Sequence, residues 1–313
     1  MLTVESTSGQ KLRKYIRTVA INWQMYVLLM PALISLAVFK YLPMSGLQIA
    51  FRDYSIFRSM SENPWVGLQH FDKLFSSRAF FQVLRNTVII SGFKIVFLFP
   101  MGIFIALLLN EIPFLRYKKA VQTIVYIPHF LSWVVIYGIF TSLLSSGGMV
   151  NHLIVSMGGQ SVNFLSNTKW FRPLLVFTAG WKECGWNAIV FVAAIAGIDQ
   201  DLYEAAQIDG AGRVRRIFSI TLPSILSTIT LMFIIRVGNL LTAGTEQILV
   251  MYNPVVYDVG DVIGTYVYRM GIGKMEYSFS TTAARSSCAD RCFCRARRSW
   301  RWARSRGKSA PPT

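Results

Sequence analysis

The chain has 313 residues, of which 53% are hydrophobic and 15% are charged, with a formal net charge of +17. Its mean hydropathy of +0.43 excludes a typical soluble domain of this length and favours one helical membrane domain.

Five apolar runs follow one another along the chain, and each is about 20 residues or longer, enough to cross about 30 Å of hydrocarbon. We therefore predict an all-α integral membrane protein with about five transmembrane helices. Pro31, Pro100 and Pro128 are expected to kink these helices. The runs are Trp23–Leu42, Thr87–Leu109, Ala120–Leu144, Pro173–Gly197 and Leu222–Ala243.

Basic clusters orient the chain with its N-terminus in the cytoplasm. The N-terminal segment 1–22 carries one cluster, and the loops after the second and fourth runs carry two more on the same side. The first run reads as an uncleaved span, because it is too long for a signal peptide. The segment 51–86 is also basic, and its acids and aromatics predict a folded external segment. The clusters are Lys11, Arg13, Lys14 and Arg17; Arg116, Lys118 and Lys119; Arg213, Arg215 and Arg216.

The segment 198–223, between the fourth and fifth runs, is predicted to form a cytoplasmic helix-turn-helix. Its first half favours helix up to Ile208, and Asp209, Gly210 and Gly212 then interrupt it. A second short helix leads to Pro223, which is tolerated in the first turn of a span. The small side chains of Ala205, Ala206 and Ala211 leave a thin face that another backbone can approach.

Three motifs carry a resemblance to a known family. The pattern E-A-A-x-x-D-G-A, followed after eight residues by I-x-L-P, resembles the coupling loop of ABC importer permeases. The stretches Tyr126–Val135 and Glu246–Ile272 resemble the carbohydrate-uptake branch, of the polysaccharide or complex-oligosaccharide type. The residues assigned to ATPase coupling are Glu204, Ala205, Ala206, Asp209, Gly210, Ala211, Gly212, Leu222 and Pro223.

The resemblance covers roughly residues 15–280 and implies a six-span permease in the inner or plasma membrane. It implies a binding-protein-dependent importer for oligosaccharides or polysaccharide fragments, in which this chain forms the translocation path. The implied partners are a second permease in a heterodimer, two ABC ATPase subunits, an extracytoplasmic sugar-binding protein and membrane lipid, but no nucleic acid. The alternative is a non-transporting membrane protein, either a defective permease copy or a regulator that binds anionic lipid.

The chain is not expected to be an enzyme or to hold a cofactor. It has no G-x-x-x-x-G-K-[ST] phosphate loop, so ATP hydrolysis is expected in a separate subunit. No H-E-x-x-H or G-x-S-x-G motif occurs. The histidines are far apart, and the C-x₃-C-x-C group at Cys288, Cys292 and Cys294 lacks a zinc spacing, so no metal site is predicted.

Polar residues inside the runs mark the candidate substrate path, because such residues are costly in hydrocarbon. Glu183 and Arg236 are expected at comparable depth. A packing ion pair is the favoured reading for Arg236, and a polar lining for a sugar cavity is the other. Tryptophan also fits the membrane interface. The candidate path residues are Trp181, Glu183, Trp186, Asn187, Asn239 and Gln247.

The carboxyl end departs from the permease domain, which is assigned to residues 23–280. From Ser278 onward there are eight arginines and one lysine against a single acid, Asp290, and no apolar run long enough for a sixth span. We favour a shifted reading frame that replaced the last span with the basic tail 281–313. A genuine basic arm and a designed truncation are the other readings. A missing span predicts poor assembly with partner subunits.

Overall fold

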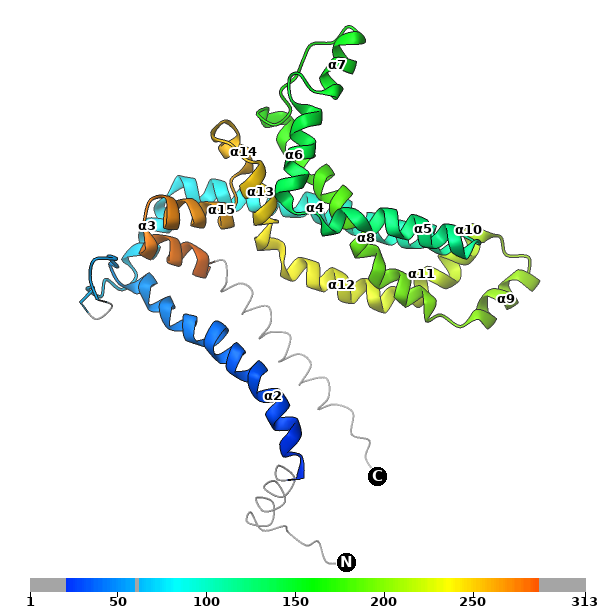
Figure 1. Ribbon diagram of the computed structural model, residues 1–313, viewed down its shortest axis with the longest axis horizontal. Helices are drawn as coiled ribbons and strands as arrows, with labels where there is room; N and C mark the ends of the chain where they lie inside the picture. Colours follow the sequence, from blue (N-terminus) through cyan, green and yellow to red (C-terminus); the bar gives the residue numbers. More distant parts are fainter. Residues whose placement is uncertain (1–20, 60–61, 287–313) are drawn as a thin grey trace, which may run out of the picture. The chain divides into compact units, whose positions relative to one another are not determined.

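The computed structural model describes residues 21–59 and 62–286, and the regular elements in these ranges are helices. Within them, the strand-like pairing is one isolated bridge between Arg52 and Trp65. The chain divides into two compact units, Met1–Gly67 and Leu68–Thr313, whose helices Figure 1 labels. The predicted all-α class is confirmed. The predicted segment 1–22 and the tail 281–313 lie almost wholly outside the described residues.

The first unit consists of a long helix and a folded loop. The helix α2 (Trp23–Leu36) continues through η1 (Ala37–Tyr41) and η2 (Leu42–Phe51), which makes a candidate span of 29 residues. Its side chains are mostly apolar and exposed, as in a helix that faces lipid or another membrane helix. In the loop, the Phe51 and Trp65 rings stack with 5.5 Å between centroids.

Two long helices form the centre of the second unit, where α4 packs along α8 (Figure 1). Ala106 and Ala188 are fully buried beside Phe191. A Cβ atom on Gly102 would lie 3.2 Å from the Cβ of Asn187. Small residues therefore let the two backbones approach closely, and helices cover the second and fourth predicted runs. The elements are α3 (Gln69–Ser76), α4 (Arg78–Asn110) and α8 (Thr168–Ala196).

The third run is not one helix, so the prediction of a single span over Ala120–Leu144 is wrong. The chain breaks at Leu131, where Lys182 of α8 donates to the free carbonyl oxygen. Ser132 then caps the next helix by accepting a hydrogen bond from Val135 N. In Figure 1, α5 runs along α8, and α6 takes a different direction from α5. The elements are α5 (Leu115–Tyr126), η3 (Ile127–Phe130), α6 (Trp133–Leu144) and α7 (Met149–Ser156).

The fifth run is bent. The helical segments Arg213–Ser224 and Leu226–Gly238 meet at Ile225 with an angle of 63°. Leu222 and Pro223 therefore end the first segment. The sequence had predicted that they open the span, and that prediction is wrong. The elements are α9 (Gln200–Ile208), α10 (Arg213–Arg216), η4 (Ile217–Thr221), α11 (Leu222–Ser224), α12 (Leu226–Gly238), η5 (Leu240–Thr242) and α13 (Thr245–Met251).

Short helices complete the described chain. They carry the chain from α13 to a helical stretch at residues 277–286, in which Ala283 is fully buried against Leu74 and Phe80. The first residues of the predicted aberrant tail are thus packed helix. The elements are η6 (Pro254–Val256), α14 (Tyr257–Gly260), α15 (Ile263–Tyr268) and η7 (Arg269–Gly273).

Among the described residues, three helices are long and apolar enough to cross a membrane, or four if the bent pair is one span. They are Trp23–Phe51, Arg78–Asn110 and Trp133–Ser156, with the bent pair around Ile225. The helix α8 is 29 residues long, but Lys182, Glu183 and Asn187 lower its hydropathy. The number of five spans stays a prediction.

Candidate functional site

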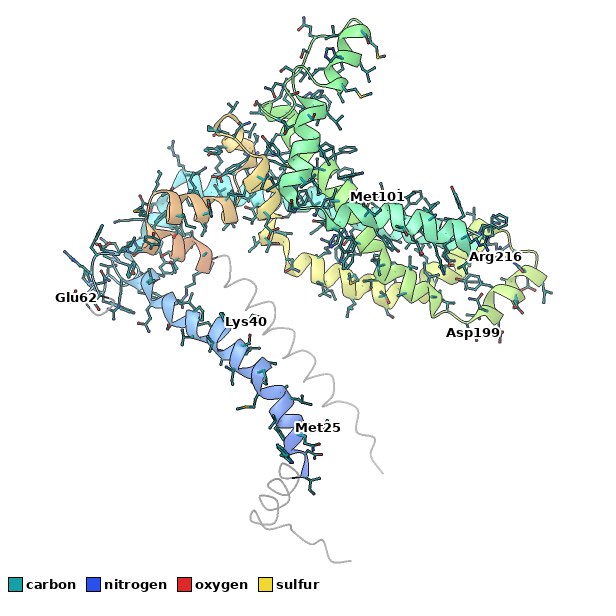
Figure 2. All side chains as sticks on the ribbon, viewed as in Figure 1. Met25, Lys40, Glu62, Met101, Asp199 and Arg216 are labelled. Atoms are coloured by element: carbon teal, nitrogen blue, oxygen red, sulfur yellow. The ribbon has the colours of Figure 1, made fainter. Side chains whose placement is uncertain are left out.

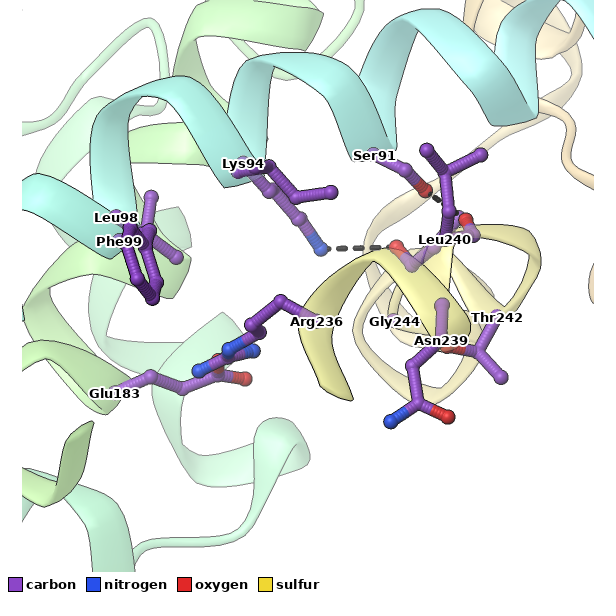
Figure 3. A pocket seen from close by; sticks show the side chains of 12 residues that line it. Ser91, Lys94, Leu98, Phe99, Glu183, Arg236, Asn239, Leu240, Thr242 and Gly244 are labelled. Atoms are coloured by element: carbon purple, nitrogen blue, oxygen red, sulfur yellow. Dashed lines mark hydrogen bonds and ion pairs between the residues drawn. The ribbon is translucent and has the colours of Figure 1, made fainter. Parts of the chain in front are cut away.

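A cavity of about 280 Å³ lies between α4, α8 and the end of α12 (Figure 3). It is notable for its charged, amide and hydroxyl groups, because the surrounding helices are largely apolar. Its lining residues are Ser91, Lys94, Ile95, Leu98, Phe99, Glu183, Arg236, Asn239, Leu240, Thr242, Ala243 and Gly244.

Lys94 enters the cavity from the middle of α4. Its ammonium donates to the Ala243 carbonyl oxygen at 2.9 Å and to Gln247 Oε1 at 2.6 Å. One turn earlier on α4, the Ser91 hydroxyl donates to the Leu240 carbonyl oxygen. Sequence reasoning missed Lys94, although a lone lysine inside an apolar run is itself a signal of a functional or paired group.

The expected ion pair between Glu183 and Arg236 is present. Arg236 NH1 lies 3.8 Å from Glu183 Oε2, and the two side chains are 35% and 31% exposed. A second guanidinium nitrogen donates to Asn187 Oδ1. The pair is therefore loose, and both of its members line the cavity; a role for them in a sugar path stays a prediction.

The backbone turn between η5 and α13 is strained. Ala243 has φ 48° and Gly244 has φ 71°, in the left-handed region that costs a non-glycine residue about 1–2 kcal/mol. A Cβ atom on Gly244 would lie 2.5 Å from Lys94 Nζ. The bonds from Ser91 and Lys94 hold this turn against α4, and glycine makes room for the ammonium.

The structure separates the six predicted path residues. Glu183 and Asn239 line the cavity. Asn187 does not line it, but accepts a hydrogen bond from Arg236, which does. Gln247 is fully buried, and its amide nitrogen donates to Leu175 O at 2.8 Å and Thr178 Oγ1 at 2.7 Å. Gln247 thus fixes α13 to α8 and does not contribute to the cavity wall.

The two predicted tryptophans lie on other faces of α8. Trp186 stacks on His129 with ring centroids 4.2 Å apart, beside the break between α5 and α6. Trp181 packs edge-on against Phe140 at 5.8 Å and lines a separate apolar groove with residues such as Phe97. Neither lines the cavity.

A second polar cluster fixes the short helices after α13. Arg172 of α8 donates to Asn86 Oδ1 at 2.8 Å and to the Val259 carbonyl oxygen at 3.1 Å. Asp261 forms an ion pair with Arg269 outside the candidate spans. Burial raises the pKa of the Asp261 carboxyl, while its hydrogen bond with Thr265 and the charge of Arg269 act in the opposite direction. This cluster joins α4, α8, α14 and α15.

The segment between α8 and α12 folds into two short helices and a turn. Asp199 caps α9 by accepting from Asp201 N at 3.2 Å, and Gly210 makes the turn with φ +74°. Tyr203 and Thr221 share a 2.8 Å hydrogen bond that ties the two helical parts together. Figure 2 shows Asp199 and Arg216 at the same end of the second unit.

The predicted coupling residues lie mostly at the surface of this segment. Glu204, Ala205, Asp209, Gly210 and Gly212 are exposed. Ala206 and Ala211 are half-buried, and the Ala211 amide donates to the Ala206 carbonyl oxygen at 2.9 Å. The apolar side chain of Ile208, at the end of α9, is 88% exposed. The segment thus presents small, apolar and acidic groups together.

In the described part of the chain, no group of three His, Cys, Asp or Glu residues is close enough to hold a metal ion. Cys184 is a free, half-buried thiol. The predicted cysteine group at Cys288–Cys294 lies outside the described residues.

Comparison with known proteins gives a family match over residues 98–285. The family is described as "Binding-protein-dependent transport system inner membrane component". Protein LplB of Bacillus subtilis (strain 168) is 45% identical over 258 residues, which covers 82% of this chain and 81% of the relative. The polygalacturonan/rhamnogalacturonan transport system permease protein YteP of the same organism is 43% identical over 258 residues, covering 82% and 80%.

Solved structures match at the level of the fold and of the sequence. A crystal structure of a bacterial ABC transporter involved in the import of the acidic polysaccharide alginate has a TM-score of 0.82 and 38% identity, and the match covers 95% of this chain and 100% of that chain. A bacterial alginate ABC transporter in complex with an alginate pentasaccharide-bound periplasmic protein has a TM-score of 0.80 and 40% identity, with coverage of 89% and 94%.

Proposed function

This chain belongs to the family of binding-protein-dependent transport system inner membrane components, and from that premise we propose that it forms the translocation path of an ATP-driven importer for oligosaccharides or polysaccharide fragments. The observation that carries the proposal is the polar cavity between α4, α8 and α12. Charged and amide groups inside membrane helices are costly unless they serve a path or a pair.

The substrate class rests on this cavity and on the relatives. Asn239 offers an amide to the cavity. The hydroxyl oxygens of Ser91 and Thr242, whose protons are donated to backbone carbonyl oxygens, add acceptors for a polyhydroxylated ligand. The relatives with printed substrates include permeases for polygalacturonan and rhamnogalacturonan and a transporter for alginate. A polysaccharide fragment is therefore the substrate class that we propose.

The segment 198–223 is proposed to contact an ABC ATPase. Its exposed Glu204 and Gly210, and the 88% exposed Ile208, support a docking role. We infer that ATP is hydrolysed in two separate ATPase subunits, and that a second permease completes a heterodimer. The alginate complex with a periplasmic protein supports an external sugar-binding protein as a further partner. The N-terminus is proposed to lie in the cytoplasm.

Reconstitution of this chain in proteoliposomes with the second permease, the ATPase subunits and the sugar-binding protein tests this function. We expect ATP-dependent uptake of a labelled oligosaccharide, and Asn239→Ala should reduce it about tenfold, because one or two hydrogen bonds of about 1 kcal/mol each are lost. Assembly, measured by co-purification of the subunits, should be unchanged. An assembled wild-type complex that takes up no oligosaccharide would favour the non-transporting alternative.

A further inference from the structure

We propose that the cavity selects sugars that carry a carboxylate, and that Arg236 and Lys94 recognise this group. The inference rests on the proposed function, since it takes the cavity to be part of the sugar path. It adds the charge of the substrate and a residue, Lys94, that sequence reasoning did not assign to the path.

The first argument is the balance of charge. Among the residues that line the cavity, Lys94 and Arg236 are cationic and Glu183 is anionic, so the lining carries one excess positive charge. A charge held inside a membrane domain is costly without a partner. A ligand group with a single negative charge, such as one carboxylate of an oligosaccharide, completes the balance.

The second argument is the surplus of hydrogen-bond donors. A guanidinium has five N–H donors, and in the described structure Arg236 makes one hydrogen bond, to Asn187. Glu183 stands 3.8 Å away, beyond hydrogen-bonding distance. Lys94 uses two of its three donors, on Ala243 and Gln247.

These donors suit an acceptor-only group. A carboxylate accepts through two oxygens and binds a guanidinium in a planar, bidentate manner. Figure 3 shows the Lys94 ammonium directed to the turn after α12 and the Arg236 guanidinium beside Glu183, and both side chains line the same cavity. A phosphate ester fits less well, because its charge of about −1.5 to −2 at neutral pH exceeds the excess of the lining. The geometry therefore points to a uronate residue of an oligosaccharide.

Direct binding to the full chain, purified in nanodiscs, tests the inference. The probes are trigalacturonate, its trimethyl ester and galactose 6-phosphate, and binding is measured by calorimetry. We expect the free acid to bind at least about tenfold more tightly than the ester, as for a charge-assisted hydrogen bond of about 1.5–3 kcal/mol. The phosphate should bind more weakly than the acid.

Three variants are expected to give three different outcomes. Glu183→Gln removes the competing anion and should tighten trigalacturonate binding several-fold. The double variant Arg236→Gln/Glu183→Gln removes the ion pair and leaves Lys94 as the charged residue of the lining, and it should reduce the preference for the acid several-fold, because the charge-assisted bonds from Arg236 are lost. Lys73→Gln removes an exposed cation on α3 that does not line the cavity, and should leave the preference for the acid unchanged.

Equal binding of acid and ester by the wild-type chain, or a double variant whose preference for the acid equals that of the wild type, would overturn the inference. Tighter binding of galactose 6-phosphate than of trigalacturonate would overturn it as well. The proposed function is tested separately by ATP-driven uptake in the reconstituted complex. Loss of uptake with acid-selective binding retained contradicts transport alone, whereas uptake without any preference for the acid contradicts this inference alone.

Discussion

At the scale of single residues, the charged groups of the cavity differ in how completely they are held. Lys94 is bonded to a backbone carbonyl and to a fully buried amide, so it stabilises the fold as well as facing the cavity. Arg236 and Glu183 are about one third exposed and 3.8 Å apart, so their mutual attraction adds little to stability. The physical chemistry thus assigns different roles to two cations in one cavity.

Lys94→Met should destabilise the chain by about 1–3 kcal/mol, because the Ala243 carbonyl oxygen and Gln247 Oε1 lose their donor in a buried site. Thermal unfolding of the chain in detergent, followed by fluorescence, measures the effect. Lys73→Met, at an exposed site on α3, is the matched control and should unfold at the wild-type temperature. Equal stability of Lys94→Met and wild type would show that the turn is not held from α4.

At the scale of elements, the apolar runs predicted helices well but did not predict how they break. The second and fourth runs form α4 and α8, and the fifth forms the bent pair that includes α12. Length and hydropathy decide whether a membrane helix forms. The break at Leu131 depends on Lys182, which lies 51 positions further along the chain. The bend at Ile225 depends on packing against Ala106 and Phe191. Such contacts between distant segments leave no local pattern in the sequence.

The residues of the candidate site likewise fall into those that a local sequence pattern could identify and those that it could not. The motif that resembles a coupling loop could be recognised because it is contiguous, and its role in coupling stays a proposal. Glu183 and Arg236 could be paired by counting helical rise from the membrane edges. Gln247 was assigned to the path because it is polar, but three-dimensional packing buries it completely between α8 and Lys94. Lys94 was missed because its partners, Ala243 and Gln247, are about 150 residues away.

The turn of the proposed coupling segment, residues 198–223, depends on one glycine. Gly210 and Gly212 both have open space where a Cβ atom would lie. They differ in backbone conformation, because Gly210 has φ +74° and Gly212 has an extended backbone with φ −67°. Gly210→Ala should therefore cost about 1 kcal/mol or more in backbone strain and reduce association with the ATPase. Gly212→Ala adds the same methyl group without strain.

Pull-down of the ATPase and the ratio of ATP hydrolysed to sugar transported measure the two variants. We expect a clear loss for Gly210→Ala and a smaller one for Gly212→Ala, whose methyl group touches no atom of this chain within 4 Å. Equal effects would mean that the conformation of the turn is unimportant for coupling.

At the scale of the whole second unit, α8 and α12 both line the cavity and flank the proposed coupling segment. The helix α8 carries Glu183 and leads into α9, and α12 carries Arg236 and follows the coupling segment. Movement of the segment would therefore shift both members of the ion pair. Because α8 is one helix of 29 residues, displacement at its end is transmitted along its length, and a domain motion of this kind is a common switching device.

The bend at Ile225 is the place where this transmission can be tested. Ile225 is 2% exposed and packs with Ala106, Phe191 and Ile195, at the 63° angle between the coupling segment and α12. Ile225→Val should lower the free energy of unfolding by about 0.5–1.5 kcal/mol, and Ile225→Ala by about 2–5 kcal/mol, because each smaller side chain leaves a larger void in the packed core. If the bend transmits motion, the ATP hydrolysed per sugar imported should rise along this series while the subunits still assemble. Stability that falls along the series with a constant ratio would show that Ile225 serves packing alone, and the transmission between coupling segment and cavity would then have to run through α8.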